Sequence, residues 1–172
     1  QDALGQRARR VLERVAQMAG WGTPLPARAD GWRAGRGLAL CEDVKTVVAQ
    51  VAEVAVHPAT GDVRVERVFC ALDCGLAINP DSVKAQVEGN VMWGVSSALV
   101  EEATLKDGRV NATNFGDYPV ITIRQAPAVL TEIIDNPTEG PYGIGEPPIG
   151  PVAPAIGNAI FAATGARLRR LP

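Results

Sequence analysis

Cysteine, histidine and aromatic residues are scarce in this 172-residue chain, which has three cysteines, one histidine and 5% Phe, Trp and Tyr. Cys41, Cys70 and Cys74 form an odd set without a Cys-x-x-Cys pair, so we expect neither a disulfide framework nor a zinc site. Buried free thiols are the expected state. The single histidine, His57, precedes Pro58 in a cluster of turn residues, and we expect it at the surface rather than in catalysis.

A strong net charge and long apolar runs are absent as well. The formal net charge is −2, so there is no positive field that would favour nucleic acid or an anionic membrane as a partner. No apolar run reaches the ~18 residues that a membrane-spanning helix needs. With 47% hydrophobic and 21% charged residues, the composition is that of an ordinary folded protein of one domain, or one domain with an appendage.

The first half of the chain reads as a helix, a connector and a β-hairpin. Apolar residues at helical spacing predict a helix over residues 2–19. Glycines and prolines predict a connector over residues 20–37. The signal is β from residue 38 to residue 73. Within it, two valine-rich runs, residues 44–56 and 63–72, flank the turn cluster 57–62 and predict an antiparallel pair of strands with at least one buried side.

Asn79-Pro80 predicts the start of a helix that continues to about residue 100, because Asn is a favoured N-cap and Pro a favoured first helical residue. Its apolar line consists of Val83, Val87, Val91, Val95 and Ala98. Gln86 flanks this line, on the same strip as Asn90, and could be either a satisfied amide at the core edge or a ligand contact. Gly89 and Gly94 interrupt the helix and indicate that another helix or a ligand approaches its backbone closely.

The remaining segments predict short strands and a mixed layer arrangement. A turn at residues 106–109 joins two short strands, and further strands are expected at residues 120–124 and 130–135. Helices and hairpins in this order indicate an α+β fold, a mixed layer arrangement of helices and β-hairpins. We divide the chain into an N-terminal helix with its connector, residues 1–37, and a C-terminal segment, residues 38–172.

A stretch near the C-terminus, residues 143–154, holds three glycines and four prolines around a single charged residue, Glu146. Such a composition predicts a shaped, irregular loop, since proline fixes φ and glycine permits close backbone approach. An apolar helix follows and ends at Gly165. Burial would disfavour the charged form of Glu146, as suits a general base, whereas the simpler alternative is a solvated glutamate in a connector.

Two motifs together resemble one enzyme family. Asp73-Cys74-Gly75, Asn79-Pro80 and Gln86-Val87-Glu88-Gly89 are similar to a signature of molybdenum hydroxylase large subunits, the xanthine dehydrogenase and aldehyde oxidase family. Gly145-Glu146-Pro147-Pro148 resembles the active-site loop of the same enzymes. The segment Asn114-Phe115-Gly116-Asp117-Tyr118-Pro119 is closest to the isoquinoline 1-oxidoreductase β-subunit and membrane-associated aldehyde dehydrogenase branch.

The resemblance implies a role for three residues. Glu146 matches the catalytic base, while Gln86 and Gly145 match residues that contact the molybdopterin cofactor, expected in its cytosine dinucleotide form. No residue of this chain is implied as a metal ligand, because the pterin dithiolene holds the molybdenum. Glu146 would then assist the oxidation of an aldehyde or of a ring carbon beside nitrogen with water-derived oxygen.

The resemblance also implies partners. The chain matches only the C-terminal end of the family's large subunit, so the remainder of that subunit is expected as another chain. The electrons are expected to leave through [2Fe-2S] clusters on an iron–sulfur partner. The alternative from a different functional class is a non-catalytic assembly module that keeps the fold and docks a partner.

Overall fold

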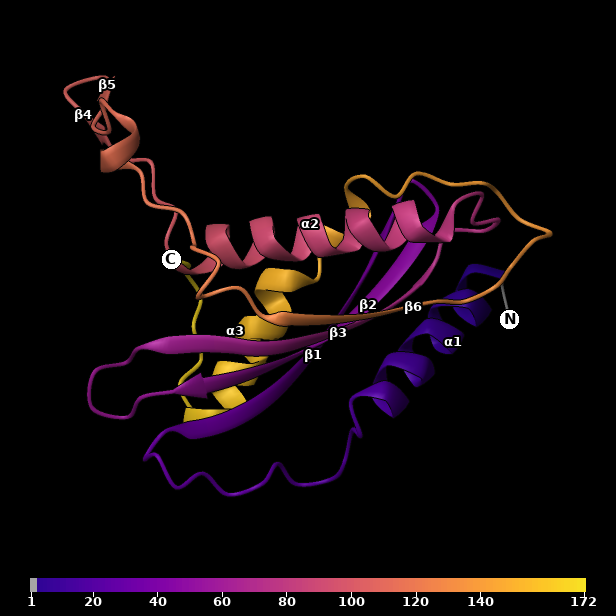
Figure 1. Cartoon of the computed structure of the whole chain (residues 1–172), viewed down its shortest axis with the longest axis horizontal. Helices are drawn as coiled ribbons and strands as arrows, with labels where there is room; N and C mark the ends of the chain where they lie inside the picture. Colours follow the sequence, from indigo (N-terminus) through magenta and orange to yellow (C-terminus); the bar gives the residue numbers. More distant parts are fainter. Residues whose placement is uncertain (1–2) are drawn as a thin grey trace.

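In the computed structural model, which describes residues 3–172, one mixed sheet lies between helices on both of its faces (Figure 1). The helices are α1 (Ala3–Met18), α2 (Pro80–Leu99) and α3 (Val152–Thr164), with short 3-10 helices η1 (Phe115–Asp117) and η2 (Pro147–Ile149). The strands are β1 (Arg33–Asp43), β2 (Thr46–Val56), β3 (Val63–Asp73), β4 (Leu105–Lys106), β5 (Arg109–Val110) and β6 (Ala128–Ile133). This arrangement confirms the expected α+β class.

The main sheet has the order β1-β2-β3-β6. Strand β2 is antiparallel to both β1 and β3, and β6 is parallel to β3. Every residue of β2 is buried, because helices cover both sides of this central strand. Alternate β2 residues face α1 on one side, including Val47 and Val51, and face α2 and α3 on the other, including Val48 and Ala52. The expected hairpin of residues 44–56 and 63–72 is therefore present as β2 and β3.

Strand β1 was predicted only in part: the β signal expected from residue 38 covers its second half, but no strand was expected at residues 33–37. The expected connector, residues 20–37, ends earlier, since β1 already begins at Arg33, and the division after residue 37 falls inside this strand. The residues Val44 and Lys45, expected at the start of a strand, form the tight turn between β1 and β2, both with positive φ. A Cβ on Gly37 would lie 2.1 Å from the backbone nitrogen of Ala159, so this glycine lets α3 pack directly on β1.

Helix α2 begins, and helix α3 ends, where the capping signals predicted. Asn79 is the N-cap of α2, and its side chain accepts a hydrogen bond from the Ser82 N–H at 3.1 Å. Gly165 ends α3 in the left-handed conformation, with φ of 79°. All five residues of the predicted apolar line of α2 are buried against the sheet and α3.

Between α2 and β6 the chain leaves the body of the molecule. Residues 101–119, including β4, β5 and η1, form an arm that extends from the C-terminal end of α2 (Figure 1). The strand expected at residues 120–124 is wrong: the Ile121 N–H donates to the Ser96 hydroxyl, and residues 122–125 form a turn. The strand expected at residues 130–135 is present as β6, two residues earlier.

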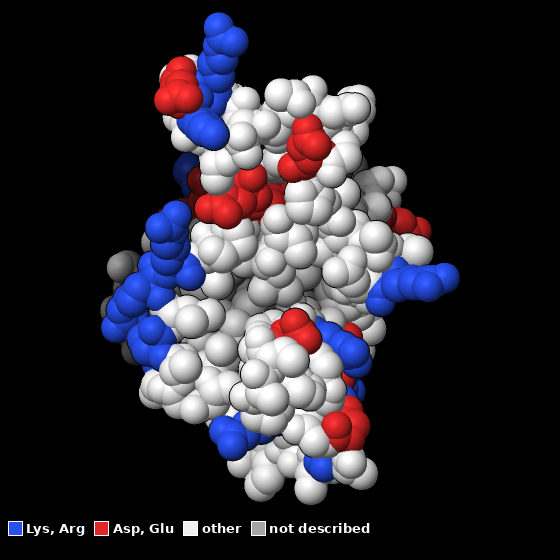
Figure 2. All heavy atoms as spheres, turned by 90° about the vertical axis from the view of Figure 1, so that its left-hand side faces the viewer, with Lys and Arg blue, Asp and Glu red and all other residues white. Residues whose placement is uncertain are grey.

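The surface carries charges of both signs. On the end of the molecule seen in Figure 2, basic and acidic side chains are interspersed, some of them side by side, and broad uncharged areas lie between these groups. This distribution accords with the small net charge of −2. Among residues 3–172, no helix is long and apolar enough to cross a membrane.

Candidate active site

Glu146 lies in an irregular segment, residues 143–150, that leads into α3 and that we call the glutamate loop. Glu146 directly precedes η2, and its carbonyl accepts a hydrogen bond from the Ile149 N–H at 3.0 Å. Pro147 and Pro148 are buried, so the loop packs through its prolines. The glutamate side chain remains exposed.

Three side chains from other elements hold the glutamate loop by its carbonyl groups. The Thr46 hydroxyl donates to the Gly143 carbonyl at 2.6 Å. The Gln50 amide donates to the Pro148 carbonyl at 2.7 Å, and the Asn90 amide donates to the Gly145 carbonyl at 2.9 Å. Since prolines supply no N–H donors, these three carbonyls of the loop depend on donors from outside it. The backbone on either side of Glu146 is therefore fixed to β2 and α2.

The same Asn90 amide connects the loop to the strip of α2 that holds Gln86. Its nitrogen also donates to the Gln86 carbonyl, at 2.8 Å. The Gln86 side chain is exposed, as is Gly89 one turn further along. The structure thus brings Gln86, Gly145 and Glu146, the three residues singled out from the sequence, to neighbouring positions on one surface.

The Glu146 carboxylate makes no hydrogen bond or ion pair within residues 3–172. Of the two alternatives from the sequence, its exposure in the structure matches the solvated glutamate and not the buried one. The apolar helix α3 that follows is buried against β1 and β2, on the far side of the two prolines. Any desolvation of Glu146 must therefore come from a group or a chain that covers this surface.

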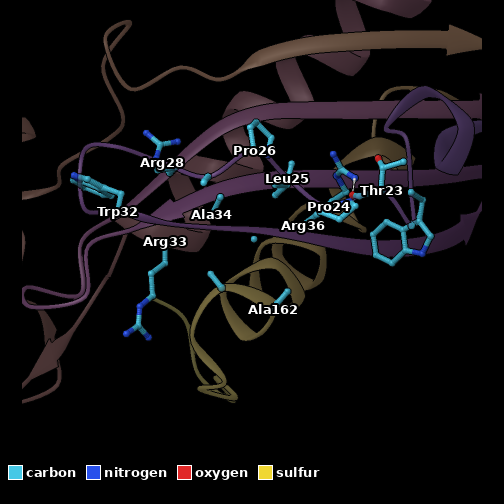
Figure 3. A pocket seen from close by; sticks show the side chains of 15 residues that line it. Thr23, Pro24, Leu25, Pro26, Arg28, Trp32, Arg33, Ala34, Arg36 and Ala162 are labelled. Carbon is cyan, nitrogen blue, oxygen red and sulfur yellow. Dashed lines mark hydrogen bonds between the residues drawn. The ribbon is translucent and has the colours of Figure 1, made fainter.

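A large open pocket lies elsewhere on the molecule. It has a volume of about 720 Å³ and is lined by residues 21–28 and 32–36 together with Ala162 and Ala163 of α3 (Figure 3). Two of its arginines are already paired: Arg28 with Asp30 and Glu66, and Arg36 with Glu53. None of the three residues singled out from the sequence lines it. We therefore base the candidate site on the glutamate loop and not on this pocket.

Comparison with known proteins identifies the family. The model of the molybdopterin cofactor-binding domain matches residues 7–127, more than half of the chain. The chain belongs to the molybdopterin cofactor-binding domain family. The match covers α1, the first three strands and α2 with Gln86, while the glutamate loop lies beyond it.

Curated relatives extend the similarity of this molybdopterin cofactor-binding domain over nearly the whole chain. It is 35% identical to one of the subunits of nicotinate dehydrogenase from Pseudomonas putida over 96% of its length. It is 36% identical to the β-subunit of isoquinoline 1-oxidoreductase from Brevundimonas diminuta over 96%, and 36% identical to a membrane-bound aldehyde dehydrogenase of Gluconacetobacter polyoxogenes over 99%. The chain spans 15%, 21% and 22% of the length of these relatives, respectively.

Solved structures show the same fold for the domain. The aldehyde oxidoreductase of Desulfovibrio desulfuricans matches with a TM-score of 0.64 at 33% identity, over 74% of this chain and 14% of that one. Quinoline 2-oxidoreductase of Pseudomonas putida 86 matches with a TM-score of 0.64 at 26% identity, over 70% of this chain and 16% of that one. The similarity in fold thus accompanies the similarity in sequence.

The exposed surface of the domain fits one side of a bound pterin cofactor. A Cβ added to Gly89 or to Gly145 would meet no atom within 4 Å, so the backbone at both positions is open to a flat group. The exposed Gln86 amide, about one helical turn before Gly89, offers two donors and an acceptor. By contrast, a Cβ on Gly94 would lie 2.7 Å from Val152, so this glycine serves the packing of α2 on α3.

The Asp73-Cys74-Gly75 motif lies next to the segment that precedes the glutamate loop and supports it. Asp73 is fully buried at the end of β3, where its carboxylate accepts two hydrogen bonds from Arg7, at 2.8 and 2.9 Å, and one from the Gly75 N–H at 2.9 Å. Asn136 donates to the same carboxylate at 3.0 Å. Burial raises the pKa of Asp73, but the hydrogen bonds from Arg7, Gly75 and Asn136 outweigh it, so the pKa lies below its usual range.

Backbone contacts extend this support towards the loop. The Tyr142 N–H donates to the Cys74 carbonyl at 2.9 Å, and the Leu76 N–H donates to the Glu139 carbonyl at 2.8 Å. A Cβ on Gly75 would lie 2.6 Å from that same carbonyl, which explains the glycine of the motif. The Asp73 cluster therefore fixes residues 136–142, directly before the glutamate loop.

The sequence did not single out the residues that hold the loop. Thr46, Gln50 and Asn90 were not assigned a role, although Gln50 is a polar residue inside an otherwise apolar run and Asn90 shares the strip of Gln86. Both amides are buried, and buried amides require partners. Within residues 3–172, no group of three or more His, Cys, Asp or Glu side chains could hold a metal ion.

Proposed function

We propose that the chain forms one wall of the active site of a molybdenum hydroxylase that oxidises aldehydes or N-heterocyclic aromatics, with Glu146 as the general base. The names of its relatives support this substrate class, since they include an aldehyde dehydrogenase, a nicotinate dehydrogenase and an isoquinoline oxidoreductase. The observation that carries the proposal is the anchored loop. It presents an exposed carboxylate, which has no partner among residues 3–172, beside an exposed amide and two open glycines.

In the proposed enzyme, Gln86 and Gly145 hold the molybdopterin cofactor, in its cytosine dinucleotide form. When bound, this cofactor supplies the two-electron oxidation chemistry. The absence of a side chain at Gly145 allows close approach, and the Gln86 amide donates and accepts hydrogen bonds at the cofactor. Glu146 removes a proton from the attacking water-derived group, a task for which a carboxylate fixed by its backbone is suited.

The proposal includes two partners. Glu146 and Gln86 lie on an open surface, so the opposite wall of the site comes from the remainder of the molybdenum-binding subunit. Electrons leave through [2Fe-2S] clusters on an iron–sulfur subunit. A non-catalytic assembly module is the competing function, and the same experiment separates the two.

The test compares Glu146→Gln with the parental protein in the assembled enzyme. Glutamine keeps the size and hydrogen-bonding capacity of the side chain but removes its basicity, so turnover should fall by about 10² to 10⁴-fold. Molybdenum content, measured by elemental analysis, should be unchanged. Glu146→Asp retracts the carboxylate and should lose about 10²-fold or more, since a displacement of about 1 Å can cost that much.

Glu13→Gln is the matched control, because Glu13 is an exposed glutamate on α1, which covers the opposite face of the sheet. It should keep both turnover and molybdenum. A Glu146→Gln enzyme with full molybdenum and near-parental turnover would refute the catalytic role. An assembled parental complex without molybdenum would favour the assembly module.

A further inference from the structure

Asn90 is a polar residue in the middle of α2 whose side chain is buried, with 9% of its surface exposed. Its amide nitrogen carries two N–H groups and donates to two carbonyl oxygens. The nitrogen lies 2.8 Å from the Gln86 oxygen and 2.9 Å from the Gly145 oxygen. One side chain thus joins the backbone of the proposed cofactor-contacting glutamine to the backbone beside the proposed base.

The other two side chains that hold the loop do not make this connection. Thr46 and Gln50 both lie on β2, and they bond to the two ends of the loop, at Gly143 and Pro148. Only the bond from Asn90, among these three, reaches the residue next to Glu146 and originates on α2. The distance between the Gln86 strip and Glu146 therefore depends on this amide.

We propose that Asn90 is a positioning residue that sets the place of Glu146 relative to the cofactor-facing strip of α2. This proposal rests on the proposed function. The bond from Asn90 to Gly145 matters for catalysis only if a cofactor on that strip and the Glu146 carboxylate must act together. Catalytic geometry is sensitive to small shifts: misplacement of a reacting group by about 1 Å can cost about 10²-fold in rate. A loop released at Gly145 would still be held at its ends but free to shift at Glu146.

If Asn90 had a purely structural role, its loss would lower stability without a specific effect on turnover. The variant Asn90→Ser distinguishes this structural role from the positioning role. In a helix, a serine hydroxyl bonds to the carbonyl four residues earlier, so the variant keeps a partner for the Gln86 carbonyl. The short side chain loses the bond to Gly145. Asn90→Thr does the same with a larger side chain and serves as the second variant.

Asn158→Ser is the matched control. Asn158 lies on α3, and its amide donates to the Leu38 carbonyl of β1 at 2.9 Å, so it also ties a helix to a neighbouring backbone. Its partner is not part of the glutamate loop. The Asn158 side-chain oxygen also accepts a hydrogen bond from Arg167 at 2.8 Å, so the control measures the general cost of losing such a tie together with that surface bond.

The measurements are made on the assembled enzyme. Hydrogen exchange, followed by mass spectrometry on peptides covering residues 139–150, reports on the loop through the Ile149 and Gly150 N–H groups, which bond within it. We expect exchange there to be about fivefold faster or more in Asn90→Ser and unchanged in Asn158→Ser. We also expect kcat to fall about 10- to 100-fold with KM and molybdenum content close to parental.

Several outcomes would overturn the proposal. Parental exchange of the loop in both Asn90 variants would show that the amide does not hold it. Equal losses of kcat in Asn90→Ser and Asn158→Ser, together with equal losses of thermal stability, would show a structural role only. If instead the loop loosens in Asn90→Ser while Glu146→Gln retains full turnover, the positioning of the loop stands and the assignment of the base fails.

Discussion

Replacing Arg7 by leucine removes the cation that pairs with the buried Asp73, and we expect this to destabilise the folded chain by about 3–5 kcal/mol. Arg7 makes three hydrogen bonds to Asp73, two to the carboxylate and one to its carbonyl, all between 2.8 and 2.9 Å. The Asp73 side chain has no exposed surface, so water cannot replace the lost donors. An uncompensated buried charge is among the most costly changes that a single substitution causes.

This loss is a large share of the roughly 5–15 kcal/mol that typically stabilises a domain. With a urea m-value of about 2 kcal/mol/M, a loss of about 4 kcal/mol moves the unfolding midpoint down by about 2 M. Urea unfolding of the chain, followed by far-UV circular dichroism at pH 7, measures the shift. The surface pair of Arg9 and Glu13 supplies the control, since Arg9→Leu should leave the midpoint unchanged.

The dependence on pH follows from the direction of the pKa shift. The pKa of Asp73 is lowered in the folded state, so its stabilising effect is fully present above the unfolded-state pKa of about 3.9. The effect is lost as pH falls through the lower, folded-state pKa. The midpoint difference between Asp73→Asn and the parental chain should therefore be constant from about pH 5 to 8 and shrink in stronger acid.

A double variant, Arg7→Leu with Asp73→Asn, tests the reasoning most directly. It removes both charges, and it should be more stable than Arg7→Leu alone because no buried charge is left without a partner. A midpoint shift below about 0.5 M in Arg7→Leu would refute the role given to this pair. A double variant less stable than Arg7→Leu would do the same.

Three further predictions concern α2. Gln86→Ala should lower molybdenum occupancy or turnover of the assembled enzyme without changing its thermal unfolding, and parental values of both would remove Gln86 from the site. Gly89→Ala should stabilise the free chain by up to about 1 kcal/mol, because alanine favours a helix and the space there is open, yet it should reduce molybdenum content in the assembled enzyme. Gly94→Ala should instead destabilise the chain by about 1–3 kcal/mol, since its Cβ would meet Val152. Urea unfolding of the two variants measures this difference. Equal effects on stability would contradict the packing of α2 on α3.

The helices could be predicted because their signals are local. Asn79-Pro80 and Gly165 act within one turn of the helix that each delimits, and the apolar line of α2 repeats at helical spacing. The antiparallel pair β2 and β3 was predicted for the same reason, as its turn cluster and valine runs are adjacent in sequence. Local sequence patterns were sufficient to predict an element wherever its limits depend on residues within or directly beside it.

The first half of strand β1 could not be predicted because its glycines serve a distant partner. Gly35 and Gly37 have the composition of a connector, and only the backbone of α3, more than 100 residues later, explains them. Similarly, residues 120–124 have the β-branched composition of a strand, but the edge of β3 pairs with residues 128–133 instead. Strand composition alone does not decide which segment reaches a partner.

The candidate site shows the same division between local and distant signals. Its glycines and prolines made the glutamate loop visible in the sequence, and the same prolines remove the N–H donors with which a loop could satisfy its own carbonyls. The missing donors come from residues 97, 98 and 55 positions away: Thr46, Gln50 and Asn90. The prolines thus mark the loop in the sequence, and they also leave its carbonyls dependent on donors from β2 and α2. Single amides on these elements therefore determine how accurately the Glu146 carboxylate is placed.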